Sequence, residues 1–330
     1  MRRIKIVLPI FLSAVLLFSG ILGIDLWKER GRGASADSES SAERKVLQKE
    51  YLRFLVAGED QGGALCDVLI LFSVNRETGE AWGLQLPRDT YAGFSQGSYR
   101  KLNGAASALG GMDALCDFLE ESFSLSLDGY VRLGSNGLRR SVDALGGVEI
   151  CLTGRMDYED PEQGLSIHLP AGTQVLDGEM AEQFVRYRSG YLRGDLDRMD
   201  AQKQFLSALY GTVREKLNPV SALRLSVSLL GSVQTDLTLP DLTELASLLL
   251  GADGGRVLLV TAPGEEATAR KSGASYYVLS APAMDRLLAE HFGGVAGGFD
   301  PKGVFLNEGY EEFIRIYRQN TECVPYILGQ

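Results

Sequence analysis

The chain has 330 residues, 45% of them hydrophobic, and a formal net charge of -10. That length fits one large or two modest domains with a substantial core, and the acidic balance argues against nucleic acid as a partner. With only two histidines, His168 and His291, a His-based catalytic triad or a multi-His metal site is hard to build.

An apolar segment follows the extreme N-terminus. Three basic side chains lie within the first five residues, and an uncharged run of 19 residues follows at 6–24. At about 1.5 Å per residue this run reaches roughly 28 Å, close to the hydrocarbon thickness of a bilayer. Because positive flanks stay in the cytoplasm, we predict a cytoplasmic tail at 1–5, a transmembrane signal anchor at 6–24 and an extracellular remainder. A cleaved signal peptide is the alternative, but its apolar region is usually shorter.

The segment 25–50 is rich in polar and charged residues. It is predicted to form an extracellular stalk between the membrane and the folded domain. The chain contains no CxxC pair, which argues against a zinc site. Outside the membrane a disulfide is allowed but not required, so the pairing of the cysteines stays open. There are four of them, Cys66, Cys116, Cys151 and Cys323.

Apolar periodicity predicts alternating strands and helices from residue 51 onward. Strands are expected at 51–58, 68–74, 81–86, 130–133, 148–152, 256–260 and 275–278. Helices are expected at 101–109, 112–123, 135–145, 178–185, 198–216, 220–230, 240–250, 281–292 and 308–318. Asp195 or Asp197 should cap the helix that begins near Arg198. This alternation predicts an α/β fold, a layered α-β-α domain with a central mixed sheet at 51–295, followed by a C-terminal extension at 296–330.

Four arginines fall within the 19 residues FVRYRSGYLRGDLDRMDAQ of this acidic chain. If the chain is extended there, Arg186 and Arg188 point to one face of it. Arg198 and Gln202 are four apart and share a face of the helix that follows. Guanidinium groups and a helix N-terminus both attract anions, and several guanidinium groups together match a pyrophosphate. A solvated surface face is the plain alternative for each arginine taken alone.

Carboxylates lie at the ends of the neighbouring predicted strands. Asp60 ends the AGED stretch, Asp67 leads the apolar strand, and LPRDT carries Arg88 and Asp89. Carboxylate oxygens are the ligands that Mg²⁺ prefers, so Asp60, Asp67 and Asp89 are candidates for holding a cation that bridges phosphates. The structural alternatives are a turn ion pair of Arg88 with Asp89 and a turn role for Asp67.

Six ordered blocks carry a family resemblance. They are AGED (57–60), DVLILFSVNRETGEAWGLQLPRDTY (67–91), YRKLNGAASALGG (99–111), VDALGGVEI (142–150), LPAGTQVLDGEMAEQFVRYR (169–188) and GDLDRMDAQKQF (194–205). Together they resemble the LytR–CpsA–Psr family of cell-envelope proteins. The resemblance implies an extracellular α/β domain on one transmembrane helix. It also implies transfer of an anionic glycopolymer from an undecaprenyl-pyrophosphate carrier to peptidoglycan, with formation of a phosphodiester.

The resemblance further implies roles for single side chains. Asp60 and Asp67 would bind Mg²⁺, with Mn²⁺ as a substitute. The pyrophosphate would be contacted by Arg88, Lys101, Arg186, Arg188, Arg198 and Gln202. Arg88 and Asp89 are the predicted catalytic residues, with Asp89 as general base for the acceptor hydroxyl and a metal-bound hydroxide or the phosphate itself as alternatives. Helices near 111–145 are expected to wall an apolar channel for the prenyl chain.

One departure from the family's pattern is Leu65, because an arginine is usual two positions before the aspartate that matches Asp67. Two alternatives stay open beside the transferase. One is a polyprenyl-pyrophosphate hydrolase with water as acceptor, since the same charged site would serve both reactions. The other, to which Leu65 gives some weight, is a non-catalytic protein that binds lipid-linked glycans and acts as a regulator. The sequence names neither the glycopolymer, whether teichoic acid, capsule or another glycan, nor the oligomeric state.

Overall fold

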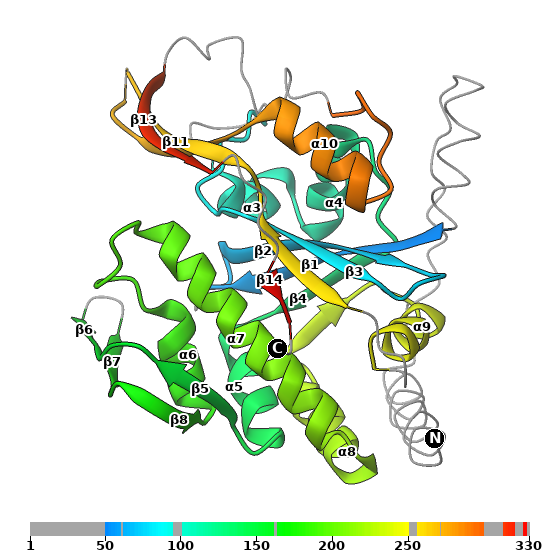
Figure 1. The fold of residues 1–330 in the computed structure, drawn as a ribbon, viewed down its shortest axis with the longest axis vertical. Helices are drawn as coiled ribbons and strands as arrows, with labels where there is room; N and C mark the ends of the chain where they lie inside the picture. The colour runs from blue at the N-terminus through cyan, green and yellow to red at the C-terminus, as the bar shows by residue number, and fades with distance from the viewer. Residues whose placement is uncertain are drawn as a thin grey trace.

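The computed structural model describes residues 50–60, 62–94, 101–161, 164–250, 256–270, 272–299, 313–320 and 326–328 (Figure 1). The predicted cytoplasmic tail, signal anchor and almost all of the stalk lie outside these residues. None of the helices in the described part is long and apolar enough to cross a bilayer.

A mixed sheet of seven strands forms the centre of the molecule, as the sequence predicted. Its order is β14 (Tyr326–Ile327), β10 (Val257–Thr261), β3 (Ala81–Leu86), β2 (Cys66–Asn75), β1 (Tyr51–Glu59), β4 (Gly129–Leu133) and β9 (Val233–Thr235). The middle strands β1, β2 and β3 are antiparallel to one another, while β4 joins β1 and β10 joins β3 in parallel. The nearly continuous apolar run of β2 fits this central place, because both faces of the sheet are covered.

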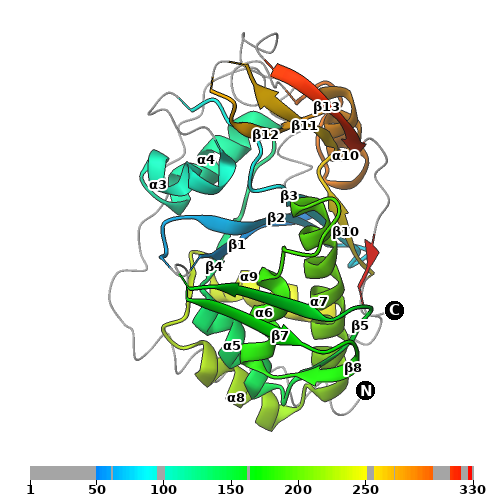
Figure 2. The same ribbon diagram turned by 90° about the vertical axis from the view of Figure 1, so that its left-hand side faces the viewer.

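One face of the sheet is covered by α3 (Ala105–Leu109), α4 (Met112–Phe123) and α10 (Ala281–His291), which Figures 1 and 2 show together on one side. Alternation along the strands sends Leu55, Leu69 and Leu71 into this layer, where they join the main core cluster. A short 3-10 turn, Leu102–Gly104, leads into α3. Beside this layer lies a second sheet of β12 (Ser275–Leu279), β11 (Gly264–Ala269) and β13 (Phe313–Asn320).

The opposite face carries the larger helical layer (Figure 2). It consists of α5 (Ser135–Ala144), α6 (Gly178–Arg186), α7 (Asp195–Lys216), α8 (Pro219–Leu229) and α9 (Leu239–Leu250). Two antiparallel pairs flank these helices, β5 (Val148–Leu152) with β8 (Gly172–Leu176) and β6 (Met156–Asp160) with β7 (Leu165–Leu169). A separate core cluster, which includes Val142, Ile167, Phe184 and Phe205, holds α5, α6, α7 and the pairs together. The layered α-β-α architecture is therefore confirmed.

Two local predictions are wrong. The long helix begins at Asp195 rather than near Arg198, and neither Asp195 nor Asp197 caps it, because Gly194 occupies that place with a φ of 58°. Glycine adopts this left-handed conformation without steric cost, so the turn is made one residue before the acids. The helix expected at 308–318 is also wrong, because Phe313–Asn320 is a strand paired with β11. Its isoleucine, phenylalanine and tyrosine residues favour a strand once a partner edge is available.

In the described part of the structure, the cysteines form no disulfide. Cys66 and Cys116 are buried and Cys151 is exposed, while Cys323 lies outside the described residues. Burial raises the pKa of the Cys66 thiol to about 11, so this side chain acts as a small apolar core residue.

Candidate active site

A cavity of about 710 Å³ lies between the sheet and the helical layer formed by α5, α6 and α7. It receives side chains from the ends of β1, β2 and β3, from the end of α6 and from the first turns of α7. The predicted site residues that line it are Asp60, Asp67, Arg88, Arg186, Arg188, Arg198 and Gln202. Segments about 140 residues apart in the chain thus meet in one place, and Asp89 and Lys101 are the predicted site residues that do not line the cavity.

The remaining walls of the cavity are largely apolar. Val56, Val68 and Ile70 come from the sheet, and further apolar side chains come from α5, α7 and the β6–β7 pair. The expectation that helices near 111–145 form these walls is only partly correct. Leu138 of α5 lines the cavity, but α4 packs Leu115 into the core on the opposite face of the sheet. The cavity therefore combines charged and apolar lining residues, and the part around Asp67, Arg88 and Arg198 is its charged end.

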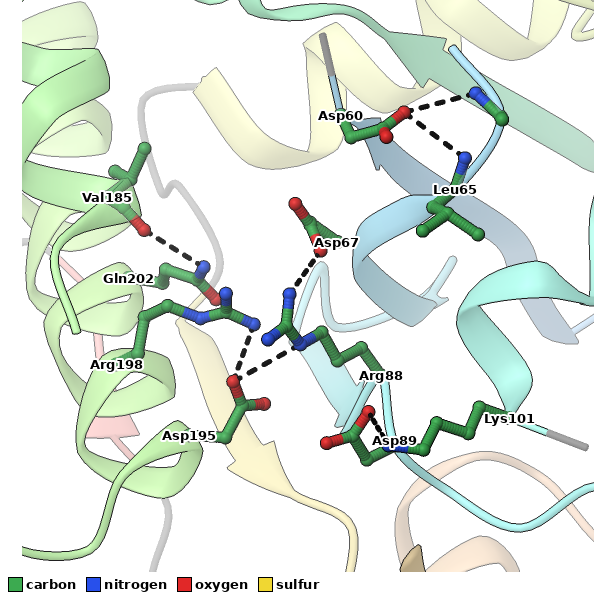
Figure 3. A network of polar contacts seen from close by, with 11 residues as sticks. Asp60, Leu65, Asp67, Arg88, Asp89, Lys101, Val185, Asp195, Arg198 and Gln202 are labelled. Atoms are coloured by element: carbon green, nitrogen blue, oxygen red, sulfur yellow. Dashed lines mark hydrogen bonds and ion pairs between the residues drawn. The ribbon is translucent and has the colours of Figure 1, made fainter. Parts of the chain in front are cut away.

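Two arginines at the charged end are held by a chain of carboxylates (Figure 3). Arg88 donates to Asp67 at 2.7 Å, and its Nε lies 3.4 Å from Asp195 Oδ1. The same Asp195 oxygen lies 2.7 Å from Arg198, three residues further along α7. Asp195 thus lies between the two guanidinium groups and draws them together. From the sequence, Asp195 is predicted only as a helix cap, although its i,i+3 spacing from Arg198 is a signal for this contact.

The pKa values of the two arginines shift in opposite directions. Burial lowers the pKa of Arg198, whose side chain is only 6% exposed, and Asp195 offsets part of this effect. For Arg88 the burial effect is outweighed by Asp195 and Asp67, so its pKa is raised. Both groups stay protonated at neutral pH, since an arginine loses its proton only far above that range. The cavity therefore presents two fixed positive charges close to each other.

Arg186 and Arg188 both line the cavity, but not as an extended pair, and that prediction is wrong. Arg186 is the last residue of α6, and the chain leaves the helix at Tyr187 with φ -58° and ψ 135°. The helix runs one residue further than its apolar pattern indicated. Arg186 donates to Glu182 at 3.2 Å, whereas Arg188 is exposed and has no ion-pair partner among the residues that the structure describes.

Gln202 links three elements at the back of the cavity. Its Oε1 accepts a hydrogen bond of 2.9 Å from Gln85 of β3, and its Nε2 donates to the carbonyl of Val185 at 3.3 Å. Gln85 is 1% exposed and Gln202 5% exposed, so this pair is buried. The amide of Gln202 therefore holds the end of α6 against the sheet beside the arginines.

Asp60 and Asp67 are the carboxylates predicted to hold a metal. Asp60 Oδ1 accepts backbone N–H groups from Ala64 at 3.1 Å and from Leu65 at 3.2 Å, which shapes the loop before β2. Within the described part of the chain there is no cluster of three or more His, Cys, Asp or Glu side chains suited to a metal. Two carboxylates still fit Mg²⁺, because this ion commonly keeps several waters and takes further oxygens from substrate phosphates.

Asp89 and Lys101 pair with each other, away from the cavity lining. The Lys101 ammonium lies 3.0 Å from Asp89 and 5.8 Å from the centre of the Tyr276 ring. Figure 3 shows Asp89 beneath Arg88, turned toward Lys101. The structure thus sends Arg88 and Asp89, although adjacent in sequence, to different partners.

Comparisons with known proteins identify the family of the chain. The LytR_cpsA_psr family model matches residues 27–292. The chain belongs to the LytR–CpsA–Psr family. A LytR–CpsA–Psr relative from Oceanobacillus iheyensis, named polyisoprenyl-teichoic acid–peptidoglycan teichoic acid transferase TagU, is 30% identical over 273 residues, which is 78% of this chain and 81% of the relative. The probable cell wall biosynthesis protein LcpB of Corynebacterium glutamicum is 38% identical over 182 residues, but these cover only 54% of this chain and 42% of LcpB.

Solved structures share the fold of this LytR–CpsA–Psr protein. The protein gbs0355 from Streptococcus agalactiae superimposes with a TM-score of 0.67 at 20% identity, over 83% of this chain and 98% of that one. A structure described as TagT bound to LI-WTA superimposes with a TM-score of 0.58 at 23% identity, over 78% of this chain and 92% of that one. At these identities the likeness establishes the fold alone.

Proposed function

We propose that this protein is an enzyme of cell-wall assembly, which transfers an anionic glycopolymer such as teichoic acid from a polyprenyl-pyrophosphate carrier to peptidoglycan. One observation carries the proposal. Four arginines line a cavity whose lining also includes carboxylates and many apolar side chains. A pyrophosphate attached to a prenyl chain has the matching two-part chemistry. The name of the TagU relative supports the same substrate class.

The reaction needs charge neutralisation more than covalent catalysis. A hydroxyl of the acceptor sugar forms a bond to the phosphorus that carries the glycan, and the bond from that phosphorus to the bridging oxygen breaks. The polyprenyl phosphate is released, and its phosphate takes up the proton of the hydroxyl, directly or through water. Arg88, Arg186 and Arg198 neutralise the negative charge that develops on the leaving phosphate, and the rigid cavity keeps donor and acceptor in line. The apolar walls bury the prenyl chain away from water, which stabilises the complex by about 0.8 kcal/mol per buried CH₂ group.

We further propose that Asp60 and Asp67 hold Mg²⁺ in the working enzyme. The ion would supply Lewis-acid neutralisation of the pyrophosphate oxygens. Asp67 would then serve two positive neighbours, the ion and Arg88, which a carboxylate with two oxygens can do. Calorimetric titration of Mg²⁺ into the wild type and Asp60→Asn in the presence of inorganic pyrophosphate tests this proposal, and equal metal binding in both would contradict it.

The predicted location belongs to the same proposal. A signal anchor at 6–24 with a stalk at 25–50 would keep the catalytic domain outside the cell, near both the lipid carrier and peptidoglycan. Fractionation of cells that express the full chain, followed by protease treatment of intact protoplasts, tests it. A protease-resistant catalytic domain would overturn this topology.

A turnover assay decides the function. The full chain in detergent is given a labelled glycan on a short polyprenyl pyrophosphate, with Mg²⁺, and with or without peptidoglycan fragments. Label in the peptidoglycan fraction is the expected result. Release of the labelled glycan phosphate at equal rates with and without acceptor would indicate a hydrolase instead, and donor binding without any product would indicate a non-catalytic binder.

A further inference from the structure

A buried acid lies in the wall of the anion-binding cavity. Glu182, in the middle of α6, is 3% exposed and lines the cavity. A buried carboxylate is costly unless it is paired, and it repels an anionic ligand. An apolar residue at this position would extend the apolar wall without this cost. The presence of the acid therefore indicates a specific role for its charge.

Glu182 has two guanidinium partners. One carboxylate oxygen accepts from Arg186 at 3.2 Å, one turn later on the same helix, and the other accepts from Nε of Arg139 on α5. Among the residues that the structure describes, Glu182 is the sole ion-pair partner of Arg186. The acid thus joins an arginine of the cavity to an arginine of the neighbouring helix.

The helices that carry this group are packed closely. A Cβ atom at Gly178 would lie 2.3 Å from the carbonyl oxygen of Arg139, so only glycine allows α5 and α6 to approach this far. The N–H of Gly178 also donates to Asp143 of α5 at 2.8 Å. Glu182 therefore stands on a rigid helix pair, whereas a free arginine side chain carries about 2 kcal/mol of rotamer entropy.

The same design recurs at the other inward arginines. Arg88 and Arg198 are held by Asp67 and Asp195, while exposed Arg188 is not held by any described residue. Among the four cavity arginines, carboxylates thus accompany the three that are partly or fully buried. Each carboxylate contacts one nitrogen of its arginine, and a guanidinium carries five N–H donors in all.

We propose that Glu182 is a positioning residue for Arg186, an assignment that rests on the proposed function. Its carboxylate fixes the orientation of the Arg186 guanidinium, so that the remaining N–H groups point at the leaving phosphate. The same carboxylate lowers the affinity of Arg186 for the bound pyrophosphate. Catalysis depends on interactions that are stronger in the transition state than in the ground state. Glu182 therefore favours turnover at the expense of ground-state affinity.

The test compares turnover with affinity for inorganic pyrophosphate in Glu182→Gln, which keeps the shape and removes the charge. We expect kcat to fall by on the order of 10- to 100-fold because Arg186 is no longer aimed. We expect pyrophosphate to bind about fivefold more tightly because the competing carboxylate is gone. If Glu182 had a purely structural role, Glu182→Gln would lower kcat and pyrophosphate affinity together or change neither of them. Either of those results overturns the proposal.

Three further variants sharpen the result. Glu182→Asp keeps the negative charge but moves the carboxylate away from Arg186, because the side chain is one CH₂ group shorter. We therefore expect kcat to fall with no gain in pyrophosphate affinity. In an Arg186→Ala background, Glu182→Gln should no longer change pyrophosphate affinity, and a change that persists there means that the acid does not act through Arg186. Glu179→Gln, an exposed acid on the same helix, is the matched control and should leave both quantities within about twofold.

The affinity arm stands apart from the proposed function. If the wild type shows no turnover with any donor, the proposed transferase fails. The pyrophosphate titrations of Glu182→Gln with and without Arg186 still decide whether the acid governs this arginine. If the wild type transfers glycan and Glu182→Gln matches it in both measurements, only the role of Glu182 is overturned. Thermal unfolding of each variant checks that it is folded.

Discussion

The carboxylate of Asp67 lies 2.7 Å from the guanidinium of Arg88, 21 residues later in the chain. The register of the β2–β3 hairpin brings them together, because Leu69 of β2 pairs with Leu86 of β3. Counting two residues outward on each strand leads to Asp67 and Arg88, so both side chains leave the same end of the hairpin. A shift of this register by one residue would separate the carboxylate from the arginine.

Replacing Arg88 tests the charged end of the cavity. We expect Arg88→Ala to lower kcat for glycan transfer by at least about 10²- to 10³-fold, because a preorganised charge at the leaving phosphate is lost. The fold should remain, since the Arg88 side chain is still 20% exposed. Initial rates and far-UV circular dichroism measure the two effects.

Arg193 provides the matched control for that experiment. It lies in the same arginine-rich stretch, but its side chain is 52% exposed and pairs with Asp197 and Asp200. Arg193→Ala should keep kcat within about twofold of the wild type. Equal losses in Arg193→Ala and Arg88→Ala would mean that general positive charge, not the cavity, accounts for activity.

Asp195 should be important for stability as well as activity. Asp195→Asn removes the negative charge between Arg88 and Arg198 and leaves two guanidinium groups facing each other. Breaking a buried ion pair in this way costs about 3–5 kcal/mol of unfolding free energy. Urea unfolding measures the loss. Asp197→Asn, whose partner Arg193 is exposed, should cost less than about 1 kcal/mol, and similar values for both variants would contradict the bridging role.

Asp89 was predicted to be the general base, and its pairing with Lys101 leads to a different expectation. We expect Asp89→Asn to lower kcat less than about tenfold, because its carboxylate already accepts from Lys101 at 3.0 Å and does not line the cavity. Loss of a general base would instead cost about 10²- to 10⁴-fold. A pH–rate profile of the variant distinguishes the two cases, because loss of the base would also remove the acidic limb.

Much of the fold follows from local patterns in the sequence. The strand at 81–86 and the helix at 112–123 have the predicted bounds, because apolar periodicity and flanking glycines define them locally. The strand at 313–320 does not follow in this way. Its backbone hydrogen bonds go to β11, which is distant in sequence. Pairing with β11 therefore makes this segment a strand, although its apolar pattern also fits a helix.

The site was predictable to a similar extent. Arg88, Arg186 and Arg198 could be brought together from motif order, but not the acids that hold them. Glu182 lies within an ordinary helical pattern, and Asp195 has the composition of a helix start. Their contacts depend on how α5, α6 and α7 pack against the sheet. Sequence therefore indicated the anion-binding groups, whereas the residues that orient them required three-dimensional packing.

The two histidines provide a test of local electrostatics. His168, exposed on β7, is hydrogen-bonded to Asp157 at 3.0 Å and to Glu159 at 2.6 Å, and these bonds raise its pKa. His291 is stacked on Trp82 with ring centres 3.8 Å apart, and burial lowers its pKa. The chain has no other histidine, so two imidazole signals suffice to separate the effects.

We expect NMR titration to show one imidazole with a pKa above the ordinary value of about 6.5 and one below it. His168→Gln should remove the higher one. Because the pKa of His168 is raised on folding, its stabilising contribution is fully present below the unfolded value and is lost as pH rises through the folded value. The Tm of the wild type should therefore fall more steeply than the Tm of His168→Gln as the pH rises from about 6 to 8. Parallel pH profiles for the two proteins would show that the Asp157–His168–Glu159 contacts do not persist in solution.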